Sequence, residues 1–207
     1  MPIARDITGP ITRNIPSSPT YGGRGPAPYQ FAFAGDGHIA TTYTLDSAKK
    51  TTITFDIIVT SSLVNTDPIG HSSHYVRLRG VENDLRLTVS PNNELAIDLT
   101  FTDNVEHSMY FDSIASGNVD IKLDGVASGE TLTAGTGGSS AMYIANNAAG
   151  GSAPLQGIIK NVRVYEANIL VAHWPIDDNS NVITDIVGGF NGTLTPGTGV
   201  WEARTGN

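Results

Sequence analysis

The feature that most constrains the fold is a two-residue period of apolar side chains, which recurs along the chain from Phe31 onward. Such alternation places one face of an extended strand in a core and the opposite face outside it. Long stretches of Glu, Lys, Leu and Ala at helical spacing are missing, and 23 Gly and 11 Pro indicate many turns. The sequence therefore predicts an all-β protein, and 207 residues fit one such domain.

The phase of the alternation predicts which residues face the core. These residues are Phe55, Ile57, Leu87, Ile97, Leu99, Ile121, Leu123, Val162 and Val164. The phase slips between Ile159 and Val162, and such a slip predicts a β-bulge. Asp124 and Gly125 directly follow one alternating run, and this dipeptide is typical of a tight hairpin turn.

Residues 1–28 differ in composition from the rest of the chain. They contain six prolines, which prevent a regular hydrogen-bonding ladder. One interpretation is a flexible tail. The other is an extended arm that docks on a neighbouring subunit, because four isoleucines at every fourth position are costly to leave in water. We favour the arm, in which the buried contacts come from Ile3, Ile7, Ile11 and Ile15.

Charge and cysteine content exclude several classes of partner and site. A net charge of −8 disfavours nucleic acid, since binding to phosphates depends on Lys and Arg. The absence of cysteine excludes disulfides, thiolate metal sites and cysteine nucleophiles. No segment approaches the roughly 18 apolar residues of a membrane-spanning helix. The start, MPIARDITGP, lacks the features of a secretory signal, so we expect synthesis in a host cytoplasm without general secretory export.

Five short motifs, in the same order along the chain, resemble strands of concanavalin A-like and laminin G-like domains. For example, GIIKNVRVY at 157–165 resembles the closing strand of that family, usually F-x-G-x-I-x-D-V-R-I-Y. The other motifs lie at 29–39, 52–59, 119–126 and 142–145. The resemblance implies a jelly-roll sandwich of two antiparallel sheets over residues 29–207. It does not identify a ligand, because the fold hosts lectins, glycosidases, adhesion modules and virion proteins.

Residues 169–207 resemble the opening strand of such domains, although here they follow the closing strand. The matching letters are LVAHWPIDD at 170–178, NGTL at 191–194 and Trp201. A strand moved between termini can pair in the same place, since the termini lie side by side. We therefore expect these residues to complete the sandwich as a C-terminal strand and tail. Together with the proline-rich arm, this layout is similar to small virion proteins of tailed phages.

The chain lacks the motifs of the catalytic classes that this fold supports. The glycosidase branch of the family carries a Glu-x-Asp-x-x-Glu strand, which does not occur here. There is no Gly-x-Ser-x-Gly element for a serine nucleophile. His71 and His74 lie in a polar loop without a carboxylate at metal-site spacing, which indicates a surface pair. We therefore predict that the protein is not an enzyme.

One acidic segment has the spacing of a calcium loop, with oxygen ligands at alternate positions. Its candidate ligands are Asp177, Asn179, Asn181 and Asp185. Val182 and Gly188 occupy the positions where an EF-hand has Gly and Glu, so the segment is not an EF-hand. A turn rich in Asp and Asn explains the pattern equally well. No other cofactor is expected.

Sugar binding would require exposed aromatic side chains. Aromatic residues make up only 7% of the chain, so most are expected in the core and soluble glycans are expected to bind weakly. Trp174 lies inside an alternating run and is assigned to the core, whereas Trp201 could be either buried or exposed. The candidate glycan contacts are Tyr110, Tyr143 and Trp201.

Two functions remain at this point. The leading hypothesis is a non-enzymatic structural protein of a tailed-phage virion, either a capsid decoration or a tail or fibre component. Its partners would be other capsid or tail proteins and further copies of the chain in a homo-oligomer, with a trimer as one form. The alternative is a lectin-like carbohydrate-binding or host-adhesion module that contacts a cell-surface glycan.

Overall fold

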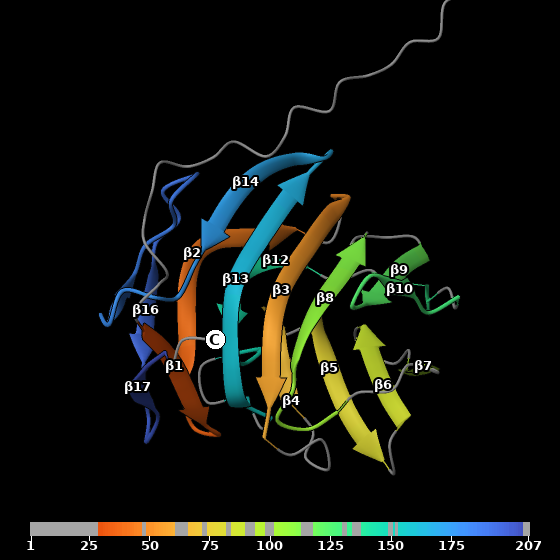
Figure 1. Cartoon of the computed structure of the whole chain (residues 1–207). Coiled ribbons are helices and arrows are strands. Elements are labelled where there is room, and N and C mark those ends of the chain that lie inside the picture. The colour runs from red at the N-terminus through yellow and green to blue at the C-terminus, as the bar shows by residue number, and fades with distance from the viewer. Residues whose placement is uncertain are drawn as a thin grey trace, which may run out of the picture.

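The computed structural model describes residues 29–46, 49–60, 66–71, 74–81, 84–89, 94–97, 102–112, 118–129, 132–133, 138–148, 151 and 153–204. Within these ranges the chain is all-β and forms two antiparallel sheets (Figure 1), so the predicted β-sandwich is confirmed. None of the described segments forms a helix that is long and apolar enough to cross a membrane. The predicted arm, residues 1–28, lies outside the described ranges.

The first sheet faces the viewer in Figure 1 and has the order β10-β9-β8-β3-β13-β1-β17. Two further strands join it, because β11 pairs with β9 and β14 pairs with β13. Its strands are β1 (Tyr29–Ala34), β3 (Thr51–Val59), β8 (Glu106–Asp112), β9 (Asn118–Leu123), β10 (Val126–Ala127), β11 (Leu132–Thr133), β13 (Gln156–Glu166), β14 (Ile169–Trp174) and β17 (Val200–Ala203).

The second sheet has the order β15-β16-β2-β12-β4-β5-β6-β7. Its strands β2, β12 and β4 are seen behind the first sheet (Figure 1). The strands of this sheet are β2 (His38–Asp46), β4 (Thr66–His71), β5 (His74–Val81), β6 (Asp84–Val89), β7 (Glu94–Ile97), β12 (Ser139–Ile144), β15 (Val182–Ile183) and β16 (Gly192–Thr195).

The core lies between the two sheets and contains every predicted core residue whose side chain the structure describes. Six predicted members are at most 4% exposed, namely Phe55, Ile57, Ile121, Leu123, Val162 and Val164. The rings of Phe55 and Phe111 stack with their centres 5.6 Å apart. Trp174 is fully buried, as predicted, and its Nε1 donates to the backbone oxygen of Phe190 at 2.8 Å. Leu99 and the side chains of Leu87 and Ile97 lie outside the described part of the structure.

Two local features predicted from the sequence are confirmed. Asp124 and Gly125 connect the paired strands β9 and β10. Their φ values of 51° and 79° are both positive, as a two-residue type I′ hairpin turn requires. The register between β13 and β3 shifts between Lys160 and Arg163. Asn161, at the shift, has a φ of 52°, so the phase slip in the sequence corresponds to a β-bulge.

The C-terminal segment adds strands to both sheets beside the first described strands. β16 pairs with β2, with Leu194 opposite Ile39, and β17 pairs with β1, with Trp201 opposite Phe31. One expectation is wrong: His71 is not a surface residue but is fully buried. His71 is the last residue of β4 and is opposite His74 of β5, so the two histidines flank a turn between paired strands. The pairing places the side chain of His71 inside, which the polar letters around it do not indicate.

Candidate functional site

A row of polar and aromatic side chains crosses the outer face of the first sheet. Each member is flanked in sequence by two buried residues, so the same alternation that builds the core directs the row outward. Cα register aligns the members across five adjacent strands. The row consists of Lys122 (β9), Tyr110 (β8), Thr54 (β3), Arg163 (β13) and His173 (β14).

A second row runs beside the first on the same face, displaced by two residues along each strand. Thr52 of β3 lies opposite Asp112 of β8 and opposite Tyr165 of β13. The hydroxyl of Thr52 donates to Asp112 Oδ1 at 2.8 Å. On the outer edge Asp112 is opposite Asp120 of β9, so this row is acidic at one end and aromatic at the other.

The two rows enclose a groove of about 270 Å³, which we call the tyrosine groove. Its lining residues are Thr52, Thr54, Tyr110, Tyr165 and Asn168. Tyr110 and Tyr165 lie on the strands at either side of β3, opposite Thr54 and Thr52 respectively, so their backbones are about 12 Å apart. The two threonines of β3 lie between them. The groove thus has two aromatic walls and a hydroxyl-bearing floor, on a sheet that is hydrogen-bonded on both sides of β3.

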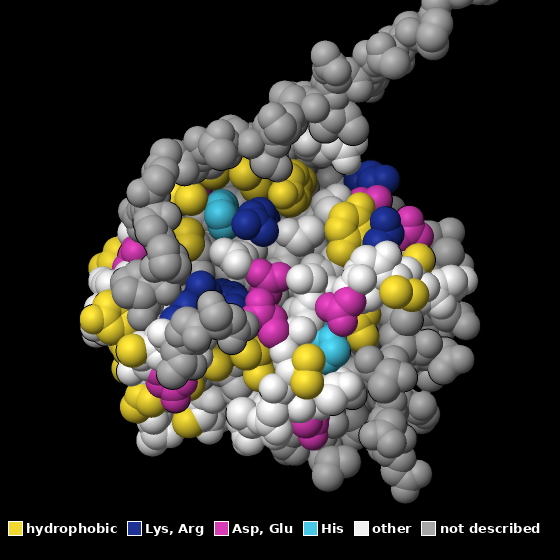
Figure 2. All heavy atoms as spheres, in the orientation of Figure 1, with side chains coloured by type: hydrophobic (Ala, Val, Ile, Leu, Met, Phe, Trp, Pro, Cys, Tyr) yellow, Lys and Arg dark blue, Asp and Glu magenta, His cyan; other side chains and the backbone are white. Residues whose placement is uncertain are grey.

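A neighbouring groove of about 260 Å³ shares Thr54 and Tyr110 with the tyrosine groove. We call it the basic groove, because its polar lining includes Lys122 and Arg163 together with Asp56 and Ser108. Figure 2 shows this face of the molecule, where acidic and basic side chains gather near the centre. The two grooves therefore form one continuous polar and aromatic surface.

Tyr110 has a cation beside its ring, and its environment raises the pKa of its hydroxyl. The Nζ of Lys122 lies 4.8 Å from the centre of the Tyr110 ring, a cation–π contact. Burial, followed by the carboxylates of Asp112 and Asp120, raises the pKa of Tyr110 above its ordinary value. The hydroxyl therefore stays protonated at neutral pH and can both donate and accept a hydrogen bond.

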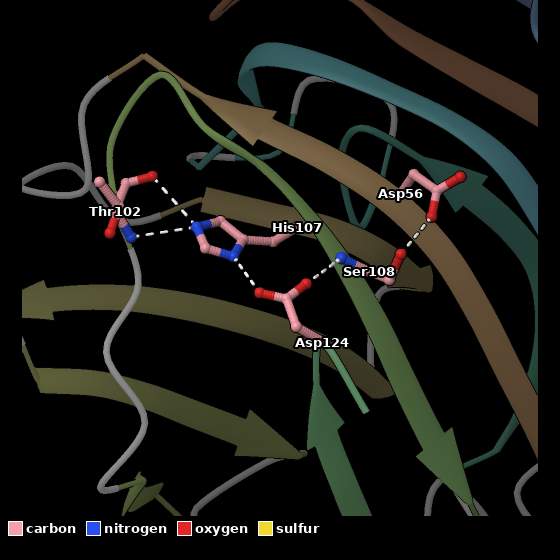
Figure 3. Close-up of polar contacts among 5 residues, drawn as sticks. All are labelled: Asp56, Thr102, His107, Ser108 and Asp124. Atoms are coloured by element: carbon pink, nitrogen blue, oxygen red, sulfur yellow. Dashed lines mark hydrogen bonds and ion pairs between the residues drawn. The ribbon is translucent and has the colours of Figure 1, made fainter. Parts of the chain in front are cut away.

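A serine, a histidine and two aspartates lie close together beside the basic groove (Figure 3). His107 Nδ1 is 2.7 Å from Asp124 Oδ2, while its Nε2 accepts from the backbone N–H of Thr102 at 3.1 Å. The hydroxyl of Ser108 donates instead to Asp56 Oδ1 at 2.8 Å. Because Ser108 does not bond to His107, these residues lack the serine–histidine hydrogen bond that activates a serine nucleophile.

The same contacts explain the ionisation of Asp124. Burial raises the pKa of this carboxyl, but the hydrogen bonds from His107 and from the backbone N–H of Ser108 outweigh burial and lower it below its ordinary value. Asp124 is thus a fixed anion that binds the hairpin turn to β8. We assign the cluster a structural role.

The three aromatic residues expected to contact a glycan do not come together. Only Tyr110 belongs to the tyrosine groove. Tyr143 lies on β12 of the other sheet between two buried neighbours, so it faces the opposite side of the sandwich, with its ring centre 5.6 Å from that of His38. Trp201 is half-buried and packs edge-on against Phe31, with ring centres 5.2 Å apart, so it belongs to the margin of the core.

The acidic C-terminal segment is organised by Asp185, whose side chain is buried. Its carboxylate accepts four backbone N–H donors at 2.8 to 3.0 Å, from His173, Val187, Gly188 and Phe190. A cation could bind Asp185 only by displacing these donors. Asp177 is half-buried, whereas Asn179 and Asn181 are exposed. In the described ranges no three His, Cys, Asp or Glu side chains are grouped so that they could hold a metal ion.

Sequence reasoning missed most of the grooves. Thr52, Thr54, Arg163 and Tyr165 all occupy the outward phase of alternating runs, which is the signal that could have marked them as surface residues. That phase does not reveal which strands are neighbours, and so it could not align these side chains. The predicted arm residues, Ile3, Ile7, Ile11 and Ile15, lie outside the described residues.

Comparison with known proteins identifies the fold. No protein-family model matches this chain, and no curated protein has a similar sequence. Among solved structures, it is similar to a candidate carbohydrate-binding protein from Bacteroides ovatus, with 15% identity and a TM-score of 0.67 over 87% of this chain and 61% of that chain. It is also similar to a heptameric SAP-like pentraxin from Limulus polyphemus, with 15% identity and a TM-score of 0.55 over 69% of this chain and 77% of that chain. These likenesses show the fold alone, a jelly-roll sandwich of two antiparallel sheets.

Proposed function

We propose that the protein is a carbohydrate-binding module that holds a sugar in the tyrosine groove and does not cleave it. The observation behind the proposal is that Tyr110 and Tyr165 line one groove from the two sides of β3, with Thr52 and Thr54 between their strands. The apolar faces of sugar rings pack against aromatic rings, and the hydroxyls of a sugar are matched by a few placed polar groups. The groove offers both on a rigid sheet. The similarity to a candidate carbohydrate-binding protein supports the proposal by analogy of fold.

The carboxylates beside the groove favour binding over hydrolysis. A glycosidase needs two carboxyl groups that flank the scissile bond, one of them protonated as the acid. Asp112 accepts a hydrogen bond from the hydroxyl of Thr52, and its Oδ2 lies 3.5 Å from Lys50 Nζ. Asp56 accepts hydrogen bonds from Ser108 and from Asn161 Nδ2 at 2.8 and 2.7 Å. Both carboxylates thus serve as acceptors for neighbouring groups of the protein, whereas a catalytic acid must donate a proton to the leaving group.

The test is a glycan screen followed by calorimetry on the best ligand. Tyr110→Ala and Tyr165→Ala should each weaken binding about tenfold, which corresponds to a loss of about 1.4 kcal/mol. Tyr143→Ala is the matched control, since it removes a half-exposed tyrosine from the opposite face, and it should leave affinity unchanged. The proposal fails if no glycan binds, or if Tyr143→Ala abolishes binding while the two groove variants retain it.

The virion hypothesis remains a separate proposal, because it rests on residues 1–28, which lie outside the described ranges. A sugar-binding sandwich also suits host adhesion by a phage particle, so the two proposals are compatible. We expect removal of residues 1–28 to leave the melting temperature of the sandwich unchanged and to prevent its incorporation into the particle. Full incorporation of the truncated chain would remove the main support for an assembly arm.

A further inference from the structure

We infer that the sugar is acidic, with a carboxylate or sulfate group that lies over Thr54 between Arg163 and Lys122 in the basic groove. This inference rests on the proposed function and names the class of ligand. The tyrosine groove and the basic groove share Thr54 and Tyr110, so a saccharide whose ring lies in the first can extend a substituent into the second.

The geometry brings the two cations to one groove. Lys122 and Arg163 lie on β9 and β13, which are separated by β8 and β3, so their backbones are about 14 Å apart. Both face outward in the same row, and both line the basic groove. Their long side chains thus border the space above Thr54 from opposite sides. Arginine also presents a planar fork of donors that matches the two oxygens of a carboxylate or sulfate.

The ion pairs of the described residues leave Lys122 and Arg163 without a carboxylate partner, so both can bind an anionic ligand. Its four lysines are Lys49, Lys50, Lys122 and Lys160. Lys49 pairs with Glu166 at 3.3 Å, Lys50 pairs with Asp112 at 3.5 Å, and Lys160 pairs with Glu106. Neither Lys122 nor Arg163 forms an ion pair with any carboxylate in the part of the chain that the structure describes. An anionic ligand would supply the missing partner for both cations.

The neighbours of Arg163 do not neutralise it. His173 is the next member of the row, and burial followed by the charge of Arg163 lowers the pKa of His173 to about 4, so its ring is uncharged at neutral pH. Among the described residues, Asp56 is the one carboxylate in the lining of the basic groove. It lies two residues beyond Thr54 on the same face, about 7 Å along β3, and its oxygens already accept from Ser108 and Asn161. The described lining of the basic groove thus holds two cations and one such carboxylate.

The experiment uses a glycan array that contains acidic sugars beside their neutralised counterparts. The pairs are uronic acids and their methyl esters, sulfated and desulfated glycans, and sialylated and desialylated glycans. We expect the full-length protein to prefer the acidic member of a pair at least tenfold. Comparison of the pairs also determines whether the recognised group is a carboxylate or a sulfate. Arg163→Gln and Lys122→Gln should each remove most of this preference, so that the acidic and the neutral member of a pair bind about equally.

Lys50→Gln is the matched control, because it removes an exposed lysine that already has a partner and does not line either groove. It should keep the preference, and an equal loss in this variant would attribute the preference to general charge attraction and overturn the inference. Melting temperatures identify any variant that fails to fold. Because Lys122 and Arg163 lie on different strands, the variant of one residue still tests the inference if the variant of the other does not fold. Equal binding of acidic and neutral members overturns the inference while the proposed function stands. A screen in which no glycan binds overturns the proposed function itself.

Discussion

Asp185 lies twelve residues after His173 in the sequence, and its Oδ1 accepts a hydrogen bond from the backbone N–H of His173 at 2.8 Å. The same carboxylate accepts three more backbone donors from the loop that follows it. The buried carboxylate of Asp185 thus holds this loop against β14, the strand that carries His173, the last residue of the first row. Within this loop Phe190 in turn accepts the indole N–H of the buried Trp174.

Asp185→Asn is therefore expected to destabilise the sandwich. The amide nitrogen that replaces one oxygen cannot accept hydrogen bonds, so two backbone N–H groups lose their acceptor. Each unmade buried bond costs about 1–3 kcal/mol, and we expect a total loss of about 2–4 kcal/mol in urea unfolding. Asn181→Ala, an exposed change in the same segment, should cost less than about 0.5 kcal/mol. A loss for Asp185→Asn as small as that of the control would contradict the structural role.

The same geometry leads to a prediction about calcium. If Asp177, Asn179, Asn181 and Asp185 bound the ion, millimolar Ca²⁺ would raise the melting temperature by mass action. Because the oxygens of Asp185 already accept four donors, we expect the same melting temperature in Ca²⁺ and in EDTA. A higher melting temperature in Ca²⁺ than in EDTA, which Asp177→Ala abolishes, would establish the calcium site.

Tyr43→Phe should weaken the connection between the two sheets. The buried hydroxyl of Tyr43, on β2, donates to Glu166 Oε1, on β13, at 2.9 Å. Burial and this hydrogen bond raise the pKa of Tyr43, so the hydroxyl remains a donor over the whole physiological range. A hydrogen bond to a charged acceptor contributes about 1.5–3 kcal/mol, and we expect a loss of this order on denaturant unfolding. Tyr143→Phe, which removes a hydroxyl on the outer face, should be nearly neutral, and equal losses in the two variants would count against the bridge.

Gly157→Ala should be strongly destabilising because β13 passes very close to β3 at this position. Gly157 lies opposite Val59 of β3 and Phe33 of β1, with a φ of +148°, and a Cβ would collide with the backbone oxygen of Ile58. We expect a loss of about 3 kcal/mol. Gly129→Ala is the control for conformation alone, since its φ is +71° and no atom lies near its Cβ position, and it should cost about 1 kcal/mol. Similar losses for the two variants would show that the collision is relieved by a small backbone shift.

The stability of the fold should fall as the pH is lowered from about 6.5 towards 4. Burial and Arg163 lower the pKa of His173 from its ordinary 6.5 to about 4, so in this window the unfolded chain binds a proton that the folded chain excludes. Stability that depends on neutral His173 is thus present above pH 6.5 and is lost progressively below it. Melting curves of His173→Gln should show a shallower decline. Burial also lowers the pKa of His38, so part of the slope should persist, and an unchanged slope in His173→Gln would refute the assignment.

What the sequence by itself determined is local. The alternation assigned Phe55, Ile57, Val162 and Val164 to the core, and the phase slip before Val162 located the bulge. These predictions succeed because a strand directs successive side chains to opposite faces wherever its partners lie, and because a turn or bulge depends on the few residues that form it.

Only the tertiary structure decided which outward-facing side chains meet. Tyr110 and Tyr165 line one groove because β3 pairs with β8 on one side and with β13 on the other, in a register that places Tyr110 opposite Thr54 and Tyr165 opposite Thr52. Likewise, the oxygens of Asp185 have the chemistry of calcium ligands, and only the folded loop supplies the four N–H donors that occupy them. The partners of β3 are segments that are distant along the chain, and the two-residue period shows which face a side chain takes but not which strand lies beside it.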